Sequence, residues 1–244
     1  MRNFFFSVGF LFLGQVAFAQ KQIEIRDQTW LGYFNQTRFT DKSGVWVDIH
    51  YRLSDDFIRE KTIGIARFAY IYYLSDAVRV MAGYAFAPRF SNTGVSQIPE
   101  HRPWQQLLWI GKKQGFTLTQ SFRIEQRFRR NVTDGELADD YNFNWRFRYN
   151  FSFAVPIVGK ELLPKNPFLL FSNEIHINAG KNVVHNYFDQ NRLSIALGYQ
   201  FTSHLNAHLG YLFVFQQEAE AGHYLHINAI RLYVIHSLDF RNIE

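Results

Sequence analysis

Arginine recurs at every second position in several stretches of this 244-residue chain. Arg146 and Arg148 stand on either side of one phenylalanine, and Arg123 and Arg127 stand two residues to either side of Glu125. A guanidinium keeps its charge and offers forked donors that fit carboxylate and phosphate groups. Rings of arginine also line anion pores. The spacing therefore predicts a site for anions, or alternatively a structural lattice of ion pairs.

Serine and histidine, the other candidates for chemistry, do not form a convincing catalytic pair. His236 and Ser237 are neighbours in an alternating segment, so their side chains point to opposite faces. Ser203 and His204 lie in a predicted turn, where turn chemistry explains both residues. The chain has no cysteine, which excludes thiol catalysis, disulfides and cysteine metal sites. We predict no catalytic residue, and a lipid-active enzyme stays an alternative without motif support.

The acidic stretch "NVTDGELADD" (131–140) is the best candidate for a metal site. Carboxylate oxygens are the ligands that calcium prefers, but the acids here lack a regular ligand spacing. The histidines elsewhere also show no metal-ligand spacing. The stretch is predicted to be a solvated loop, and we predict neither a metal nor a cofactor.

The elements that must position the arginines are β-strands. In "YNFNWRFRYNFSF" (141–153), aromatic and polar residues alternate without a break, which is the period of a strand with two different faces. The predicted lipid-facing residues are the aromatics of this stretch and of the last strand: Phe143, Trp145, Phe147, Tyr149, Phe151 and Phe240. The predicted lumen-lining residues lie on the opposite parity of several strands: Asp48, Arg52, Arg67, Arg123, Glu125, Arg127, Arg146, Arg148, Glu174, Arg192 and Arg231. Asp239 is a further acid expected in the lumen.

Strand number and connections together indicate a transmembrane barrel. Eleven alternating segments are clear, and residues 21–27 add a twelfth, which would bring both termini to the periplasmic side. Short turns alternate along most of the chain with longer connections, an asymmetry typical of outer-membrane barrels. The longer connections are expected at 55–61, 89–102, 130–140, 179–190 and 217–223, with a proline-bounded one at 156–167. The sequence predicts an all-β, antiparallel transmembrane barrel of about 12 strands, with 10 as the runner-up. A soluble sandwich with an aromatic core is the competing interpretation.

The N-terminal sequence predicts the cellular location of the protein. Arg2, the apolar run from Phe4 to Leu13 and the Ala-Phe-Ala at 17–19 have the order of a secretory signal peptide. No later apolar run reaches the length of a membrane helix. We therefore expect a signal peptide at 1–19, cleaved near Ala19, and a barrel at 20–244 in the outer membrane of a Gram-negative cell. The expected partners are outer-membrane lipid and, through the C-terminal strand, the barrel-assembly machinery.

The positive charge of the chain does not indicate nucleic-acid binding. The chain carries 26 basic and 21 acidic residues, with a pI of about 9.4. Its basic residues are spread singly along strands and do not form the clustered patch that phosphate backbones require.

Six stretches carry a resemblance to a known family. They are "WLGYFNQTRF" (30–39), "EHRPWQQLLW" (100–109), "RIEQRFRR" (123–130), "RFRYNF" (146–151), "YFDQNR" (187–192) and "VFQQ" (214–217). In this order they resemble a domain-of-unknown-function family of small bacterial proteins that are taken to be outer-membrane barrels. The resemblance implies fold and location only, because that family carries no activity that could be transferred.

Three functions stay open at this point. A porin-like channel for small anionic solutes requires an open lumen. A structural or binding barrel has a lumen plugged by its own side chains. A lipid-active enzyme needs a serine and a histidine that converge near the membrane boundary.

Overall fold

The computed structural model describes residues 21–91 and 95–241, and every regular element in these ranges is a β-strand. The strands are β1 (Gln22–Arg38), β2 (Ser43–Ser54), β3 (Glu60–Tyr73), β4 (Val78–Phe86), β5 (Arg89–Phe90), β6 (Gln97–Ile98), β7 (Glu100–Lys113), β8 (Phe116–Thr133), β9 (Glu136–Pro156), β10 (Asn166–Ala179), β11 (Phe188–Gln200), β12 (Leu205–Gln217) and β13 (His223–Asp239). The described residues contain no helix that is long and apolar enough to cross a membrane. The predicted signal peptide lies outside the described residues.

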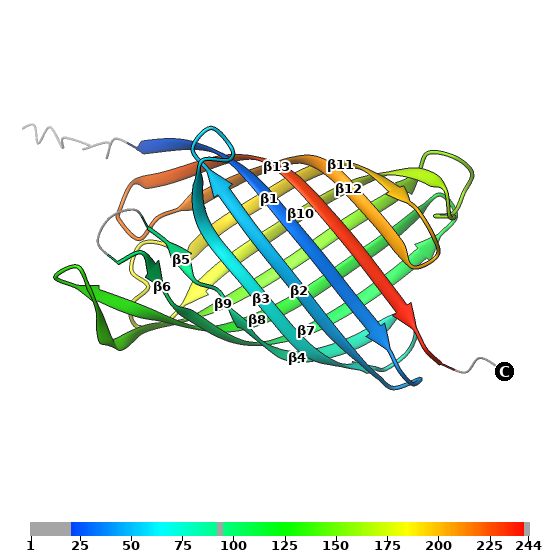
Figure 1. The fold of residues 1–244 in the computed structure, drawn as a ribbon, viewed down its shortest axis with the longest axis horizontal. Coiled ribbons are helices and arrows are strands. Elements are labelled where there is room, and N and C mark those ends of the chain that lie inside the picture. The colour runs from blue at the N-terminus through cyan, green and yellow to red at the C-terminus, as the bar shows by residue number, and fades with distance from the viewer. Residues whose placement is uncertain (1–20, 92–94, 242–244) are drawn as a thin grey trace, which may run out of the picture.

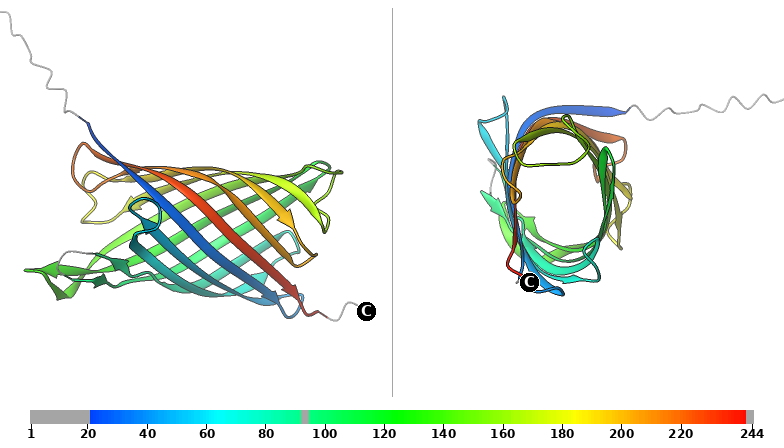
Figure 2. Two further views of the ribbon diagram at one scale, coloured as in Figure 1. Left: turned by 45° about the horizontal axis from the view of Figure 1, so that its top comes forward. Right: turned by 90° about the vertical axis from the view of Figure 1, so that its right-hand side faces the viewer.

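Eleven of the described strands form one closed barrel (Figure 1). Each strand of the ring hydrogen-bonds to the next in the order β1, β2, β3, β4, β7, β8, β9, β10, β11, β12, β13, and β13 returns to β1. The two-residue strands β5 and β6 stay outside this ring and extend the sheet beyond β3. Seen along its axis, the barrel is a ring of tilted strands (Figure 2, right). The prediction of an all-β barrel is confirmed.

The period-two pattern gives the barrel wall its two faces. In β11, Leu193, Ile195 and Leu197 point outward and are 57%, 47% and 57% exposed. Ser194 and Ala196, between them, point inward and are buried. Successive side chains of a strand point to opposite sides, so an alternating sequence separates an apolar outside from an inside of different composition.

The ring closes through a parallel pair, β1 with β13, whereas its other pairs are antiparallel. Residues 21–27 were expected to form a strand of their own. Instead they continue into Trp30 and beyond as one 17-residue strand, β1, which pairs with β13 along its whole length. The barrel therefore has eleven strands in its ring, and β1 and β13 run in the same direction. The expectation that both termini share one end is wrong, since residue 21 and residue 241 lie at opposite ends (Figure 1).

The connections divide between the two ends of the barrel. The turn end, where β13 finishes, carries the connections 39–42, 74–77, 114–115, 157–165 and 201–204. The opposite end, called here the hairpin end, carries 55–59, 87–99, 134–135, 180–187 and 218–222. Most of the short turns thus lie together, as expected, and the proline-bounded connection shares their end.

The predicted loop at 130–140 is instead the tip of a long hairpin. β8 and β9 continue to a two-residue turn at Asp134 and Gly135, whose φ values are 53° and 81°. Two positive φ angles characterise the tight type I′ hairpin turn, which aspartate followed by glycine favours. Asp139 and Asp140, expected in a solvated loop, lie on β9 and contact Arg130 and Asn131 of β8.

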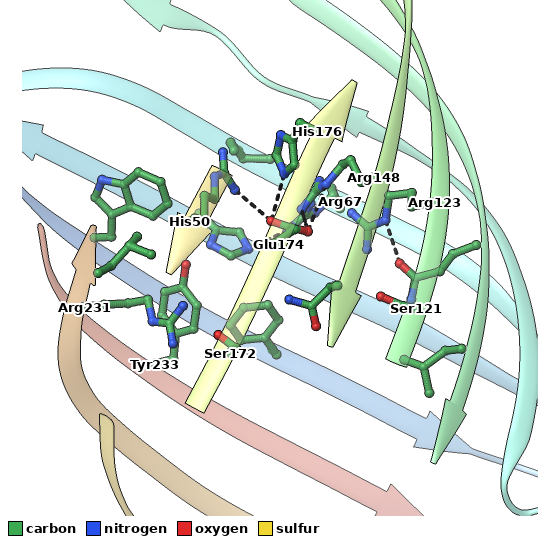
Figure 3. Close-up of a pocket in the computed structure, with 18 of the residues that line it drawn as sticks. His50, Arg67, Ser121, Arg123, Arg148, Ser172, Glu174, His176, Arg231 and Tyr233 are labelled. Carbon is green, nitrogen blue, oxygen red and sulfur yellow. Dashed lines mark hydrogen bonds and ion pairs between the residues drawn. The ribbon is translucent and has the colours of Figure 1, made fainter. Parts of the chain in front are cut away.

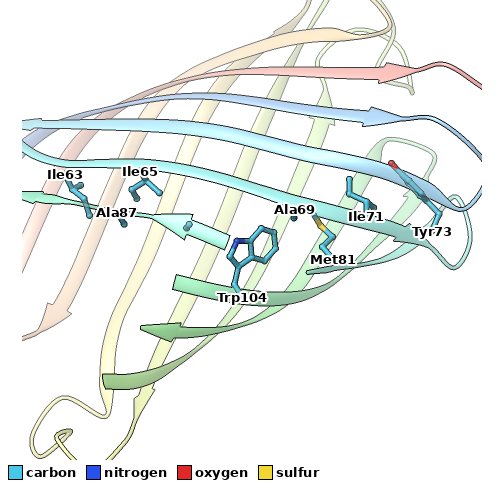
Figure 4. Close-up of a cluster of buried hydrophobic side chains, with 9 residues drawn as sticks. Ile63, Ile65, Ala69, Ile71, Tyr73, Met81, Ala87 and Trp104 are labelled. Atoms are coloured by element: carbon cyan, nitrogen blue, oxygen red, sulfur yellow. The ribbon is translucent and has the colours of Figure 1, made fainter. Parts of the chain in front are cut away.

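Much of the interior is filled with apolar side chains. One cluster lies on the inner faces of β3, β4 and β7 and around Ala87 (Figure 4). It contains Ile63, Ile65, Ala69, Ile71, Tyr73, Met81, Ala85, Ala87 and Trp104. A second cluster, around Trp30, joins β1, β12 and β13. The barrel is narrow enough for inner side chains to pack against one another.

Two glycines make room for aromatic rings on the inner face. Gly32 faces Tyr233 across the β1–β13 pair, and a Cβ at Gly32 would lie 2.9 Å from that ring. Gly198 faces Phe168 in the same way, with 2.2 Å to the nearest ring atom. A glycine covered by a cross-strand aromatic ring is a known device for fixing register in a curved sheet. Tyr233 and Phe168 both line the cavities described next.

Candidate functional site

The predicted lumen residues all lie on the inner face, and eight of the eleven line one cavity of about 260 Å³ (Figure 3). This cavity is called the central chamber. Those eight are Arg52, Arg67, Arg123, Arg146, Arg148, Glu174, Arg192 and Arg231. Asp48, Glu125 and Arg127 are buried in the packed layers around it. Asp239 departs from the expectation, because it lies at the rim of the turn end and binds Arg241 at 2.7 Å.

Glu174 of β10 is the centre of one ion-pair group. Its carboxylate lies 2.6 Å from Arg148 of β9, 3.2 Å from Arg192 of β11 and 2.9 Å from His176. Figure 3 shows Arg148 and His176 pointing toward this carboxylate. Arg148 also contacts Glu125 at 2.6 Å. Arg148 faces another arginine, Arg123, across the β8–β9 pair, so these two acids offset a repulsion that would destabilise the sheet.

A second group lies on the opposite wall of the barrel. Asp48 of β2 faces Arg67 of β3 directly and accepts a hydrogen bond of 2.7 Å from it. His50 contacts both residues, at 2.8 Å from the aspartate and 2.6 Å from the arginine. The indole of Trp46 donates a further hydrogen bond to Asp48. Asp48 is fully buried, and these three partners satisfy it.

A third group closes the space toward the hairpin end and is called the ion-pair layer. Glu100 of β7 lies 2.5 Å from Arg127 and 2.9 Å from Arg102. Asp189 of β11 lies 2.7 Å from Arg146. Glu100 is 0% and Arg127 is 2% exposed. A path for solutes would have to open these buried pairs.

The acids of the ion-pair layer were missed at the sequence level. Glu100 and Asp189 fall inside the connections expected at 89–102 and 179–190. In the structure, β7 begins at Glu100 and β11 begins at Phe188, so both acids belong to strands. The alternation of Glu100, Arg102 and Trp104 was the available signal, because it continues the inward parity of β7 to its first residue.

Two arginines of the central chamber have no carboxylate partner among the described residues. No acid of the described ranges pairs with Arg52 or Arg231. Arg52 stacks at 3.5 Å over Trp30, and Arg192 approaches the same ring at 5.0 Å. Arg231 hydrogen-bonds to Ser194 at 2.9 Å. Buried nitrogens without a hydrogen bond remain on Arg52 (Nε), Arg123 (Nη1) and Arg231 (Nε).

A second cavity, of about 410 Å³, lies between the central chamber and the turn end. This cavity is called the vestibule. Leu108, Ile110, Phe168, Leu170 and Ile235 contribute to its mostly apolar surface. It shares seven lining residues with the chamber: Phe34, Trp46, Leu108, Thr119, Asn150, Ser172 and Tyr233. The two cavities are therefore neighbours along the barrel axis, one mostly apolar with a single arginine, Arg79, and one lined by many arginines.

The connection 157–165 borders the vestibule at the turn end. Its Leu162 lines the cavity, and the loop reaches over part of the barrel opening (Figure 2, right). Backbone hydrogen bonds from Gly115 to Lys160 (3.0 Å) and from Lys165 to Gln200 (2.6 Å) hold the loop there.

The rim of the turn end carries separate, exposed ion pairs. Arg38 donates a hydrogen bond of 2.6 Å to Asp76, and this bond lowers the pKa of the Asp76 carboxyl from its ordinary value. Arg241 contacts Asp41 at 3.0 Å. These pairs lie outside the wall-spanning segments, and their exposure limits their contribution to stability.

The candidate catalytic and metal residues do not form sites. Ser237 lines the vestibule, whereas His236 contacts Tyr33 at 3.3 Å on the other face of β13. His204 donates a hydrogen bond from Nδ1 to the backbone oxygen of Ser237 and does not contact its hydroxyl. Within the described part of the chain, no group of three or more acids, histidines or cysteines could hold a metal ion.

Comparison with known proteins gives one match. Residues 27–224 match the model of a family described as "Protein of unknown function (DUF2490)". No curated protein and no solved structure matches the chain.

Proposed function

The chain belongs to the DUF2490 family, and we propose that it is an outer-membrane barrel that binds an anionic group in its central chamber and does not conduct solutes. The observation that carries this proposal is the contrast inside the lumen. The arginines Arg127 and Arg146 of the ion-pair layer are held by carboxylates, whereas Arg52 and Arg231 of the chamber beside it have no carboxylate partner among the described residues. A buried charged donor left without a partner costs about 1–3 kcal/mol, so an acidic group in the chamber would stabilise the barrel.

The outer surface supports a location in a membrane. Phe68, Leu193 and Tyr211 are 60%, 57% and 47% exposed on three different strands. Apolar surface of this extent is rare on soluble monomers and marks an interaction with lipid or protein. The predicted signal peptide is consistent with export. Since short turns face the periplasm in such barrels, the turn end and the vestibule would face the periplasm.

The channel alternative has less support from the geometry. A ring of arginine suits anion permeation, but Glu100 and Asp189 hold Arg127 and Arg146 in ion pairs at the hairpin end of the chamber. Both acids are buried, which favours a closed hairpin end over a wetted constriction. The enzyme alternative lacks a serine–histidine pair at the positions that suggested one.

We expect the purified barrel, reconstituted in lipid nanodiscs, to bind inorganic phosphate or butanoate with saturable heat in isothermal titration. The Arg52→Met, Arg231→Met double variant should lose at least about tenfold in affinity, because each charge-assisted hydrogen bond contributes about 1.5–3 kcal/mol. Neither arginine belongs to an ion pair, so the fold should persist. Arg241→Met at the rim is the matched control and should bind as the parent does. Absence of saturable binding of either anion to the parent would refute the proposed function.

A further inference from the structure

We infer that the ligand is a single-chain amphiphile, with its carboxylate or phosphate head in the central chamber and its alkyl chain in the vestibule. This inference rests on the proposed function and specifies its ligand. The head site and the chain site are adjacent cavities that share Phe34, Trp46 and Tyr233. A small hydrophilic anion would use only the first of them.

The head site is built by side chains from several walls. Arg123 of β8 is 8% exposed, and its Nη1 has no hydrogen bond, since Glu125 lies 3.7 Å away. Arg52 of β2 and Arg231 of β13 line the same chamber, and each has one more buried nitrogen without a hydrogen bond. Arginine from three walls around one cavity suits an anion with two or three oxygens.

The chain site matches one alkyl chain in size and chemistry. Its volume of about 410 Å³ lies near the lower end of the roughly 300–1,000 Å³ typical of small-molecule sites. Leu162 and Phe168 border it, and the ring of Phe168 packs directly over Gly198. A second chain of a phospholipid would need apolar space that the chamber, lined by arginines, does not offer.

The strand geometry gives the length of the alkyl chain that would fit. From Arg123, at the head site, to Thr117, at the vestibule, β8 advances six residues. This corresponds to roughly 20 Å along the strand at about 3.3 Å per residue, or roughly 15 Å along the axis at a tilt near 40°. An extended alkyl chain advances about 1.25 Å per carbon, given C–C bonds of about 1.52 Å. About twelve carbons would therefore fill the distance to the turn end.

Titration of the nanodisc-embedded barrel with dodecanoate, dodecyl phosphate, dodecanol and butanoate tests this inference. Dodecanoate or dodecyl phosphate should bind at least about a hundredfold more tightly than butanoate, because burial of each additional methylene strengthens binding. Dodecanol should bind weakly, since it leaves the arginines unpartnered. The ratio between dodecanoate and dodecyl phosphate identifies the head group.

A variant of the vestibule separates the chain site from the surrounding lipid. Ala154 lines the vestibule from β9, so Ala154→Phe should reduce dodecanoate binding toward the level of butanoate and leave butanoate binding unchanged. Val155→Phe, one residue along and on the outer face, is the matched control and should change neither. Equal affinity for butanoate and dodecanoate, or dodecanol binding as tightly as dodecanoate, overturns the inference while the proposed anion site survives. Loss of binding of all anions would instead reject the proposed function itself.

Discussion

Arg148→Met should destabilise the barrel by about 3–5 kcal/mol, because it removes one partner of a buried ion pair and leaves charge behind. Arg148 is the arginine that contacts both Glu125 and Glu174, at 2.6 Å each. Glu174 would keep Arg192 and His176, but Glu125 would keep only Arg123, at 3.7 Å. Urea titration of the refolded barrel in lipid, followed by tryptophan fluorescence, measures the change.

The control for this variant is an arginine whose carboxylate partner is exposed to solvent. Arg130 lies 3.0 Å from Asp139, whose side chain is fully exposed, in the hairpin formed by β8 and β9. Arg130→Met should cost less than about 1 kcal/mol, as exposed ion pairs do. Adding Glu125→Gln to Arg148→Met should recover part of the lost stability, since it removes the uncompensated acid. Equal costs for Arg148→Met and Arg130→Met would contradict the assigned role of the buried network.

Ile195→Arg should cost about 2–4 kcal/mol in a lipid bilayer, because it places a charge on the outer face near the middle of β11. Ile195 is 47% exposed and faces Tyr211 and Phe171 on the neighbouring strands. If this surface lies in lipid, the penalty depends on depth. Unfolding of the variant in vesicles of about 30 Å hydrocarbon thickness gives the value.

Phe201→Arg is the matched control for depth. Phe201 is also outward and 48% exposed, but it follows the last residue of β11 at the turn end. Its replacement should cost about 0–1 kcal/mol, as charges near the interface do. Equal tolerance of arginine at positions 195 and 201 would argue against a membrane around this barrel.

The two faces of the wall could be predicted from the sequence because the signal is local. Alternation over residues 141–153 or 192–201 depends only on the geometry of one strand. All eleven predicted lumen residues accordingly lie on the inner face in the structure. The pairing of Arg148 with Glu174 could be anticipated only as one of several possibilities, since it joins two separate strands.

Features that depend on distant strands could not be predicted in this way. The parallel pair of β1 and β13 joins residues about 200 positions apart, and its existence decides both the strand count and the position of the termini. Glu100 and Asp189 were assigned to loops because proline, glycine and asparagine near them indicate turns. β7 and β11 extend past those turn signals because they pair with neighbouring strands. The sequence of one strand alone does not reveal this pairing. The apolar packing around Trp104 likewise joins side chains of β3, β4 and β7, which no single strand reveals.

Single-channel recording in planar bilayers shows whether the lumen is closed toward the hairpin end. The purified barrel would be inserted across a salt gradient, and its conductance and reversal potential would be measured. We expect no steady conductance, because the buried pairs of Glu100 with Arg127 and of Asp189 with Arg146 lie across the lumen at that end. A stable chloride-selective conductance, reduced in the Arg127→Met, Arg146→Met double variant, would contradict it and establish a channel.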